Sequence, residues 1–229
     1  MSKRFACFSA LLLILNGFVS AQHATVMEPK LGKWSVSVGY GIAGSFFVRS
    51  YDESAVTPGD VYFYKKKFMG EAKSMGLRYR LSKGYSLSLD YTAQRFSGRV
   101  NYTGKIGPVT IFVDRRIYHV DNIYSILVGK QVYTSAQQGL ATLEGALGVY
   151  YIRSRQNELK FVPAFATYED EERNYNNSHL EEAGACMELN YEWAFQPRMI
   201  LGIKGRFLFT LSTMAAESII LQPSLTYKF

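Results

Sequence analysis

The most regular feature of the sequence is an alternation of large apolar residues with small or polar ones. In the run 34–42, Trp, Val, Tyr and Ile occupy every even position, and only Ser and Gly occupy the odd ones. A period of two places successive side chains on opposite faces of a β-strand, whereas a helix repeats every 3.6 residues. The run therefore predicts a strand with one apolar face and one small, polar face.

Seven further runs alternate in the same way, so the sequence predicts eight strands. The other runs cover residues 74–81, 85–92, 120–129, 143–151, 187–195, 201–210 and 219–229. Pro223 lies within the last run, and we expect a bulge there because proline cannot donate to a strand ladder.

The connections between these runs alternate in length. The turn Ser82-Lys83-Gly84 is short and contains glycine, which predicts a hairpin between its neighbours. Other connections are predicted to be longer loops, at 49–65, 101–116 and 154–181, while 213–217 is short. An up-and-down antiparallel order follows, with short turns at one end and most of the longer loops at the other.

The width of an eight-stranded barrel decides which face points inward. A soluble, lipocalin-like barrel would enclose the apolar face, whereas an outer-membrane barrel turns that face outward into lipid. Eight strands leave an interior just wide enough for side chains to fill, so roughly forty large apolar side chains would not fit inside. The predicted fold class is therefore all-β: a closed antiparallel up-and-down transmembrane β-barrel of eight strands.

Aromatic residues make up 15% of the chain and gather at one predicted end of the barrel. In the up-and-down order, the end with the short turns receives Trp34, Tyr85, Trp193, Phe195, Tyr227 and Phe229. Aromatic side chains form girdles at the interfaces of membrane barrels, so we interpret this group as one such girdle.

Charged residues occupy the small, polar face and would therefore lie in the lumen. The predicted charge network consists of Arg78, Arg80, Asp90, Asp121, Glu144, Glu188, Glu192, Lys204 and Arg206. Buried charges are costly unless they are paired. From the hairpin turns we expect Glu188 to lie opposite Arg206, and Arg78 to lie diagonal to Asp90.

The first residues have the pattern of a cleaved secretory signal peptide. Lys3 and Arg4 precede an apolar core, and small residues end at Ala21. We predict a signal peptide at 1–21, a periplasmic segment at 22–32 and the barrel at 33–229; the alternative for the first segment is a membrane anchor. Cleavage would change the net charge from +7 to 7 − 2 = +5 and leave a single cysteine, Cys186, hence no internal disulfide. A mildly basic exported protein suits anionic lipid headgroups better than nucleic acid.

These features together resemble the small bacterial outer-membrane β-barrel proteins. The signal peptide, the eight runs over 33–229 and the terminal Tyr227-Lys228-Phe229 are similar to those of the OmpA transmembrane domain and of OmpX-like proteins. The resemblance implies location in the bacterial outer membrane, with no cofactor or metal. It also implies that the barrel-assembly machinery reads Tyr227 and Phe229 as a terminal signal during biogenesis.

The scaffold hosts many roles, so function is the weaker inference. We expect a non-enzymatic surface protein whose lumen is plugged and whose loops contact lipopolysaccharide or other partners. Cations expected near the outer rim can pair with lipopolysaccharide phosphates or act only as solvated charges: Lys65, Lys66, Lys67, Arg115, Arg116, Arg153 and Arg155. The alternatives are a narrow pore for small solutes or ions and, less favoured, a rim enzyme using His119 and Asp121, for which the sequence supplies no nucleophile.

Overall fold

The computed structural model describes residues 33–46, 61–63, 68–106, 109–135, 141–162, 167–212 and 214–229. The predicted signal peptide and the segment 22–32 lie outside these residues. Within the described ranges, no helix is both long enough and apolar enough to span a membrane.

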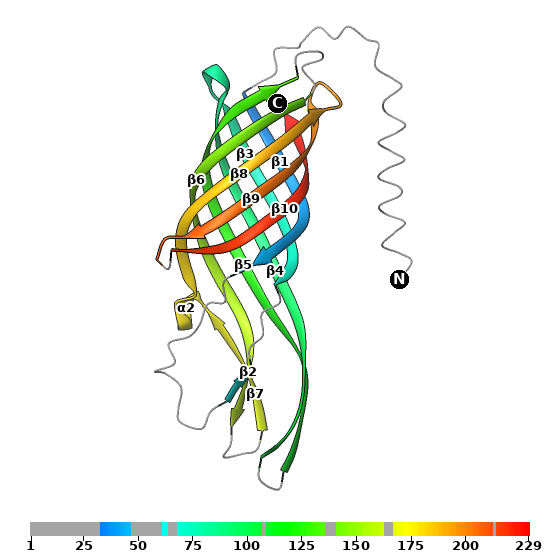
Figure 1. The fold of residues 1–229 in the computed structure, drawn as a ribbon, viewed down its shortest axis with the longest axis vertical. Helices are drawn as coiled ribbons and strands as arrows, with labels where there is room; N and C mark the ends of the chain where they lie inside the picture. Colours follow the sequence, from blue (N-terminus) through cyan, green and yellow to red (C-terminus); the bar gives the residue numbers. More distant parts are fainter. Residues whose placement is uncertain are drawn as a thin grey trace, which may run out of the picture. The chain divides into compact units, whose positions relative to one another are not determined.

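Eight strands form a closed antiparallel barrel, as Figure 1 shows. They are β1 (Trp34–Ser45), β3 (Met69–Arg80), β4 (Tyr85–Ile106), β5 (Val109–Thr134), β6 (Ala141–Val162), β8 (Glu181–Ala194), β9 (Met199–Thr210) and β10 (Ala215–Lys228). Each pairs with its neighbour in this order, and β10 returns to pair with β1. The predicted fold class and the number of strands that close the barrel are confirmed.

Two ends of the barrel differ in their connections, and we name them accordingly. The turn end carries the tight turn Ser82–Gly84, the bend after Ala194 and the C-terminal Phe229. At the opposite end, the loop end, β4, β5 and β6 continue well past the other strands (Figure 1). Two short strands, β2 (Val61–Phe63) and β7 (Thr167–Asn174), pair with this extension of β6, and the one-turn helix α2 (Tyr175–Ser178) follows β7.

This extension corrects two of the predicted loops. Residues 101–116 are not a loop, because β4 and β5 remain paired from Tyr85 and Lys130 up to Ile106 and Val109. Most of 154–181 is likewise strand, in β6 and β7. The β-branched residues of 109–113 favour an extended backbone, although this part of the sheet has left the barrel.

Pro223 lies in a regular part of β10, contrary to the predicted bulge. The register of β10 against β9 shifts between Ala216 and Ser218 instead. Beside Pro223, the ladder to β1 is interrupted between the pairs Gly39–Ser224 and Ile42–Leu221. The missing N–H of proline is therefore accommodated by a local gap in one ladder and leaves the alternation of β10 unchanged.

Gly148 on β6 allows two neighbouring strands to approach closely. A Cβ atom on this residue would lie only 2.0 Å from the carbonyl oxygen of Ile126 and 2.8 Å from the Cα of Leu127. Gly145, on the same strand, has its nearest atom at 3.7 Å, which is ordinary contact. The nearby backbone of β5 therefore requires glycine at position 148 but not at position 145.

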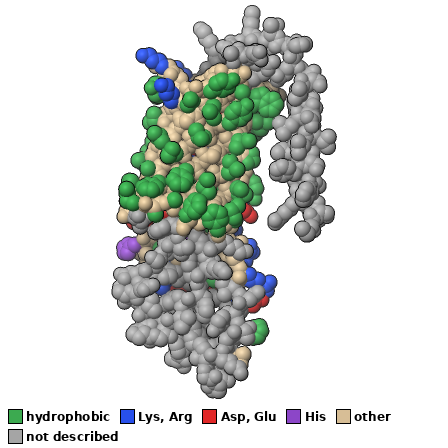
Figure 2. All heavy atoms as spheres, viewed as in Figure 1, with side chains coloured by type: hydrophobic (Ala, Val, Ile, Leu, Met, Phe, Trp, Pro, Cys, Tyr) green, Lys and Arg blue, Asp and Glu red, His purple; other side chains and the backbone are tan. Residues whose placement is uncertain are grey.

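The apolar face of the barrel points outward. Leu89 is 51% exposed and Met187 is 58% exposed, whereas the neighbouring Asp90 and Glu188 are 7% and 5% exposed. Figure 2 shows hydrophobic side chains spread over the barrel wall. A wall of this kind is stable only in lipid, and a closed barrel satisfies its backbone hydrogen bonds there. The chain is therefore a membrane-spanning barrel of the outer-membrane type.

Candidate functional site

Four charged side chains meet in the middle of the lumen. The guanidinium of Arg206 donates from Nε to Glu188 Oε2 at 2.8 Å and makes a second contact to the same oxygen through Nη2. Its Nη2 also lies 3.2 Å from Asp90 Oδ1. Lys204 Nζ donates to the same oxygen of Asp90 at 3.0 Å. Each of these groups is at most 7% exposed, so all four are buried.

A second group of charges lies next to the first, nearer the turn end. Arg78 Nη1 donates to Glu192 Oε1 at 2.5 Å, and its Nε lies 3.7 Å from Glu144 Oε1. Ser86 donates to the same oxygen of Glu144 at 2.9 Å. Arg80 Nη2 is 3.8 Å from Glu192 and its side chain is 40% exposed, so it forms the edge of the group towards solvent.

The two groups together form what we call the lumen plug. It contains four cations, Arg78, Arg80, Lys204 and Arg206, and four carboxylates, Asp90, Glu144, Glu188 and Glu192. The formal charges therefore cancel, which is the condition under which buried ions are tolerated. Cys186, also on the lumen face, is 1% exposed and fills space beside the plug.

One of the two ion pairs expected from the sequence is present, and the other is replaced. Glu188 and Arg206 are directly opposite in the β8–β9 ladder. Asp90 is opposite Gly76 and therefore diagonal to Arg78, as predicted. The two do not form an ion pair, however, because Arg78 reaches across the lumen to β6 and β8 and Asp90 reaches to β9.

His119 and Asp121 are buried in the lumen and do not lie at an open rim. His119 Nε2 lies 2.6 Å from Asp121 Oδ1, and its Nδ1 lies 2.8 Å from Gln156 Oε1. Ser154 donates to Asp121 Oδ1 at 2.5 Å, so this serine points at the acid and not at the imidazole. Both His119 and Asp121 are 1% exposed. Among the residues described, no cluster of three or more His, Cys, Asp or Glu is arranged to hold a metal.

Aromatic side chains surround the turn end of the barrel. Trp34 is the cross-strand partner of Tyr79, with ring centroids 4.7 Å apart, and Tyr227 lies 5.4 Å from Phe229. Tyr85 and Trp193 begin and end their strands at the same end, and Phe195 follows in the bend. The sequence-predicted aromatic group therefore lies together in space.

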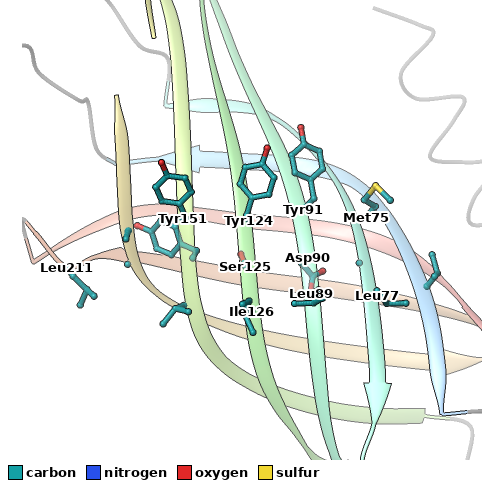
Figure 3. A pocket seen from close by; sticks show the side chains of 16 residues that line it. Met75, Leu77, Leu89, Asp90, Tyr91, Tyr124, Ser125, Ile126, Tyr151 and Leu211 are labelled. Carbon is teal, nitrogen blue, oxygen red and sulfur yellow. The ribbon is translucent and has the colours of Figure 1, made fainter. Parts of the chain in front are cut away.

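A second set of aromatics was not singled out from the sequence. Tyr91, Tyr124 and Tyr151 are cross-strand partners on β4, β5 and β6. Figure 3 shows their rings side by side on the outer wall, with the hydroxyl groups pointing the same way. Tyr91 donates to Asn122 Oδ1 at 2.7 Å, towards the loop end. We call these residues the tyrosine row; they mark where the apolar wall gives way to polar residues.

The predicted basic residues that the structure describes at the loop end lie on the extensions of β5 and β6. Arg153 stacks on Tyr151 and Tyr175, with its guanidinium carbon 5.4 and 4.8 Å from the ring centroids. Arg115 and Arg116 are exposed on the extension of β5, and Arg155 is exposed on β6. Lys65, Lys66 and Lys67 lie outside the described residues.

Arg99 and Asp114 form a forked ion pair on the exposed β4–β5 extension. Arg99 Nε donates to Asp114 Oδ1 at 2.5 Å, and Nη2 contacts the other oxygen. These hydrogen bonds hold the pKa of the Asp114 carboxyl below its ordinary value. The pair is therefore fully formed above the ordinary aspartate pKa and is lost as the pH falls through the lowered pKa.

An NMR titration of the Asp114 carboxyl carbon should therefore give a midpoint below that of an unpaired aspartate. The Arg99→Gln variant should return the midpoint to the ordinary value, because the glutamine carries no charge. Equal midpoints in the two proteins would show that the pair does not form in solution.

Comparisons with known proteins find structural similarity at low sequence identity. No protein-family model matches the sequence, and neither does any curated protein. The attachment invasion locus protein Ail of Yersinia pestis superposes with a TM-score of 0.47 at 12% identity, over 87% of this chain and 99% of that one. The N-terminal β-barrel domain of Pseudomonas aeruginosa OprF superposes with a TM-score of 0.45 at 10% identity, over 87% of this chain and 100% of that domain. Neisserial surface protein A superposes with a TM-score of 0.45 at 10% identity, over 88% of this chain and 100% of that one. At these values, the role of the chain has to be argued from its own residues.

Proposed function

We propose that this protein is a sealed, non-enzymatic barrel of the outer membrane. In this proposal the barrel anchors the β4–β5–β6 extension at the cell surface, with the loop end outside and the turn end in the periplasm. The observation that carries the proposal is the lumen plug, in which four cations and four carboxylates neutralise one another across the interior.

A polar layer on the loop-end side of the plug also supports a sealed lumen. Tyr150 and Thr210 share a hydrogen bond of 3.0 Å, and Thr210 donates to Glu217 at 2.8 Å. Gln94 donates to Ser218 at 3.1 Å. A passing ion would have to break these bonds and the plug together, which disfavours conduction.

The refolded wild-type barrel should therefore be silent in a planar lipid bilayer. A variant that truncates both Arg78 and Glu192 to alanine should also be silent, because the group of Arg206, Glu188, Asp90 and Lys204 and the polar layer still close the lumen. Heat-modifiable migration on a gel would show that both proteins are folded. Steady conductance by the wild type would contradict the proposal and indicate a narrow pore.

The surroundings of His119 and Asp121 support a structural role for this pair. General acid–base catalysis requires groups that can reach a substrate. Here both residues are enclosed, and the pair is held by Gln156 and Ser154. We infer that the pair fixes the loop end of the lumen, as one would expect of a protein that is not an enzyme.

Two kinds of partner belong to the proposal. Exposed Arg115, Arg116 and Arg155 are suited to the phosphates of lipopolysaccharide, since guanidinium binds phosphate through paired hydrogen bonds. At the turn end, Phe229 is 57% exposed, while its backbone N–H donates to the carbonyl oxygen of Trp34 at 3.1 Å. This fixed, accessible terminus suits recognition by the barrel-assembly machinery.

A further inference from the structure

The outer wall is hollowed at the loop end, just beyond the tyrosine row. Residues from β3, β4, β5 and β6 line this hollow: Glu71, Lys73, Ala93, Gln94, Arg95, Tyr118, Val120 and Arg155. Two of its cations, Lys73 and Arg95, had not been singled out from the sequence. They come from strands that are distant from Arg155 in the chain, and only the register brings the three residues onto one patch of wall.

The hollow carries more positive than negative charge. Lys73, Arg95 and Arg155 are all exposed, and the lining contains a single carboxylate, Glu71. Glu71 is the cross-strand partner of Arg95. Within the described part of the chain, however, none of the three cations lies within ion-pair distance of a carboxylate. The hollow is therefore a surface with three cations available to an anion.

Small or apolar side chains and a hydrogen-bonded tyrosine make up the rest of the hollow's lining. Ala93 and Val120 are small or apolar, so they leave space between the longer cationic side chains. The phenol of Tyr118 donates to Glu172 at 3.0 Å, and its backbone N–H donates to Asn157 at 2.6 Å. Glu172 of β7 therefore accepts a hydrogen bond from the phenol that lines the hollow.

The hollow adjoins the lipid-facing wall of the same four strands. Arg95, Val120 and Arg155 are cross-strand partners, four residues along each strand from the tyrosine row. On the other side of that row, the wall is a shallow apolar depression lined by Met75, Leu77, Leu89, Ile126 and Val149, among others (Figure 3). A cationic hollow and an apolar surface thus meet at the aromatic boundary, where headgroups lie.

We propose that Lys73, Arg95 and Arg155 form a binding site for a phosphate of a phosphorylated lipid in the outer leaflet. The acyl chains of that lipid would lie on the apolar depression below the tyrosine row. The inference deepens the proposed lipopolysaccharide contact and depends on the proposed orientation of the barrel. Two arginines and a lysine match phosphate chemistry, and the adjoining apolar wall favours a lipid over a free anion.

The test measures the affinity of purified lipid A for the full barrel in zwitterionic nanodiscs. A site variant, Lys73→Gln/Arg95→Gln/Arg155→Gln, removes three charges from the hollow. A matched control, Lys33→Gln/Lys130→Gln/Arg198→Gln, removes three exposed charges towards the turn end. A cation near an anionic lipid contributes about fivefold in affinity, so we expect the site variant to bind about 100-fold more weakly. The control should bind as the wild type does.

Three results would overturn the site. The two variants could weaken binding equally, which would mean that net charge alone matters. The site variant could bind lipid A as the wild type does, which would leave lipopolysaccharide contact to other residues. Inorganic phosphate could displace lipid A completely, which would indicate a free-anion site. None of these affects the conductance experiment, so failure of the sealed-barrel proposal would be seen separately.

Discussion

Replacing Arg206 with glutamine should lower the free energy of unfolding by about 3–5 kcal/mol, because removing one partner leaves buried charges uncompensated. Arg206 contacts both Glu188 and Asp90, and it is 2% exposed. Lys204 would remain, but it lies 3.8 Å from Glu188 and is already bonded to Asp90. Urea titration of the barrel refolded in lipid vesicles measures the change.

A double-mutant cycle separates this pair from the rest of the plug. Glu188→Gln should also destabilise the barrel. The double variant should lose less unfolding free energy than the sum of the losses in the two single variants. The exposed Arg115→Gln variant is a suitable control, and its unfolding free energy should stay close to that of the wild type. Strict additivity of Glu188→Gln and Arg206→Gln would show that the two side chains do not interact.

Gly148→Ala should destabilise the barrel by about 3 kcal/mol, since overpacking against a fixed backbone has costs of this order. The added methyl would meet the carbonyl oxygen of Ile126 at 2.0 Å, and neither strand can move without disturbing its ladder. Gly145→Ala, on the same strand, meets nothing closer than 3.7 Å and serves as the matched control. The same urea titration compares them.

Equal stability of the two glycine variants would contradict the close approach of β5 and β6. A large loss of stability in Gly148→Ala alone would show that β5 and β6 cannot move apart at this position. Folding yield should follow the same order, because the strained variant must form the same β5–β6 ladder.

Alternation was sufficient to predict which residues face the lumen. The period of two does not depend on how strongly the strands tilt, so Asp90, Glu188 and Arg206 were assigned to the correct face. The Glu188–Arg206 pair was also predictable, because a tight hairpin fixes the register locally. Arg78 could not be paired correctly, because its partner Glu192 lies 114 residues away and the contact depends on closure of the whole sheet.

The features missed at the loop end have a related cause. The sequence 101–116 has no sustained alternation of large apolar and polar residues and contains Gly104, Gly107 and Pro108, so it resembled a loop. The tyrosine row and the three cations of the hollow come from four different strands, and only the register places them side by side. Single-strand patterns contain no information about such neighbours.

The lumen plug also bears on the order of events when the barrel forms. Glu188 and Arg206 are 18 residues apart and can meet as soon as the β8–β9 hairpin exists. Asp90 and Lys204 are 114 residues apart, on β4 and β9, so they meet only when the first and last strands have come together. None of the ion pairs of the plug involves β1 or β10, the strands of the seam, yet the contacts between β4 and β9 span that seam from the inside. Closing the seam therefore completes the neutralisation of the interior, and the β4–β9 contacts help to hold the closed barrel together from within.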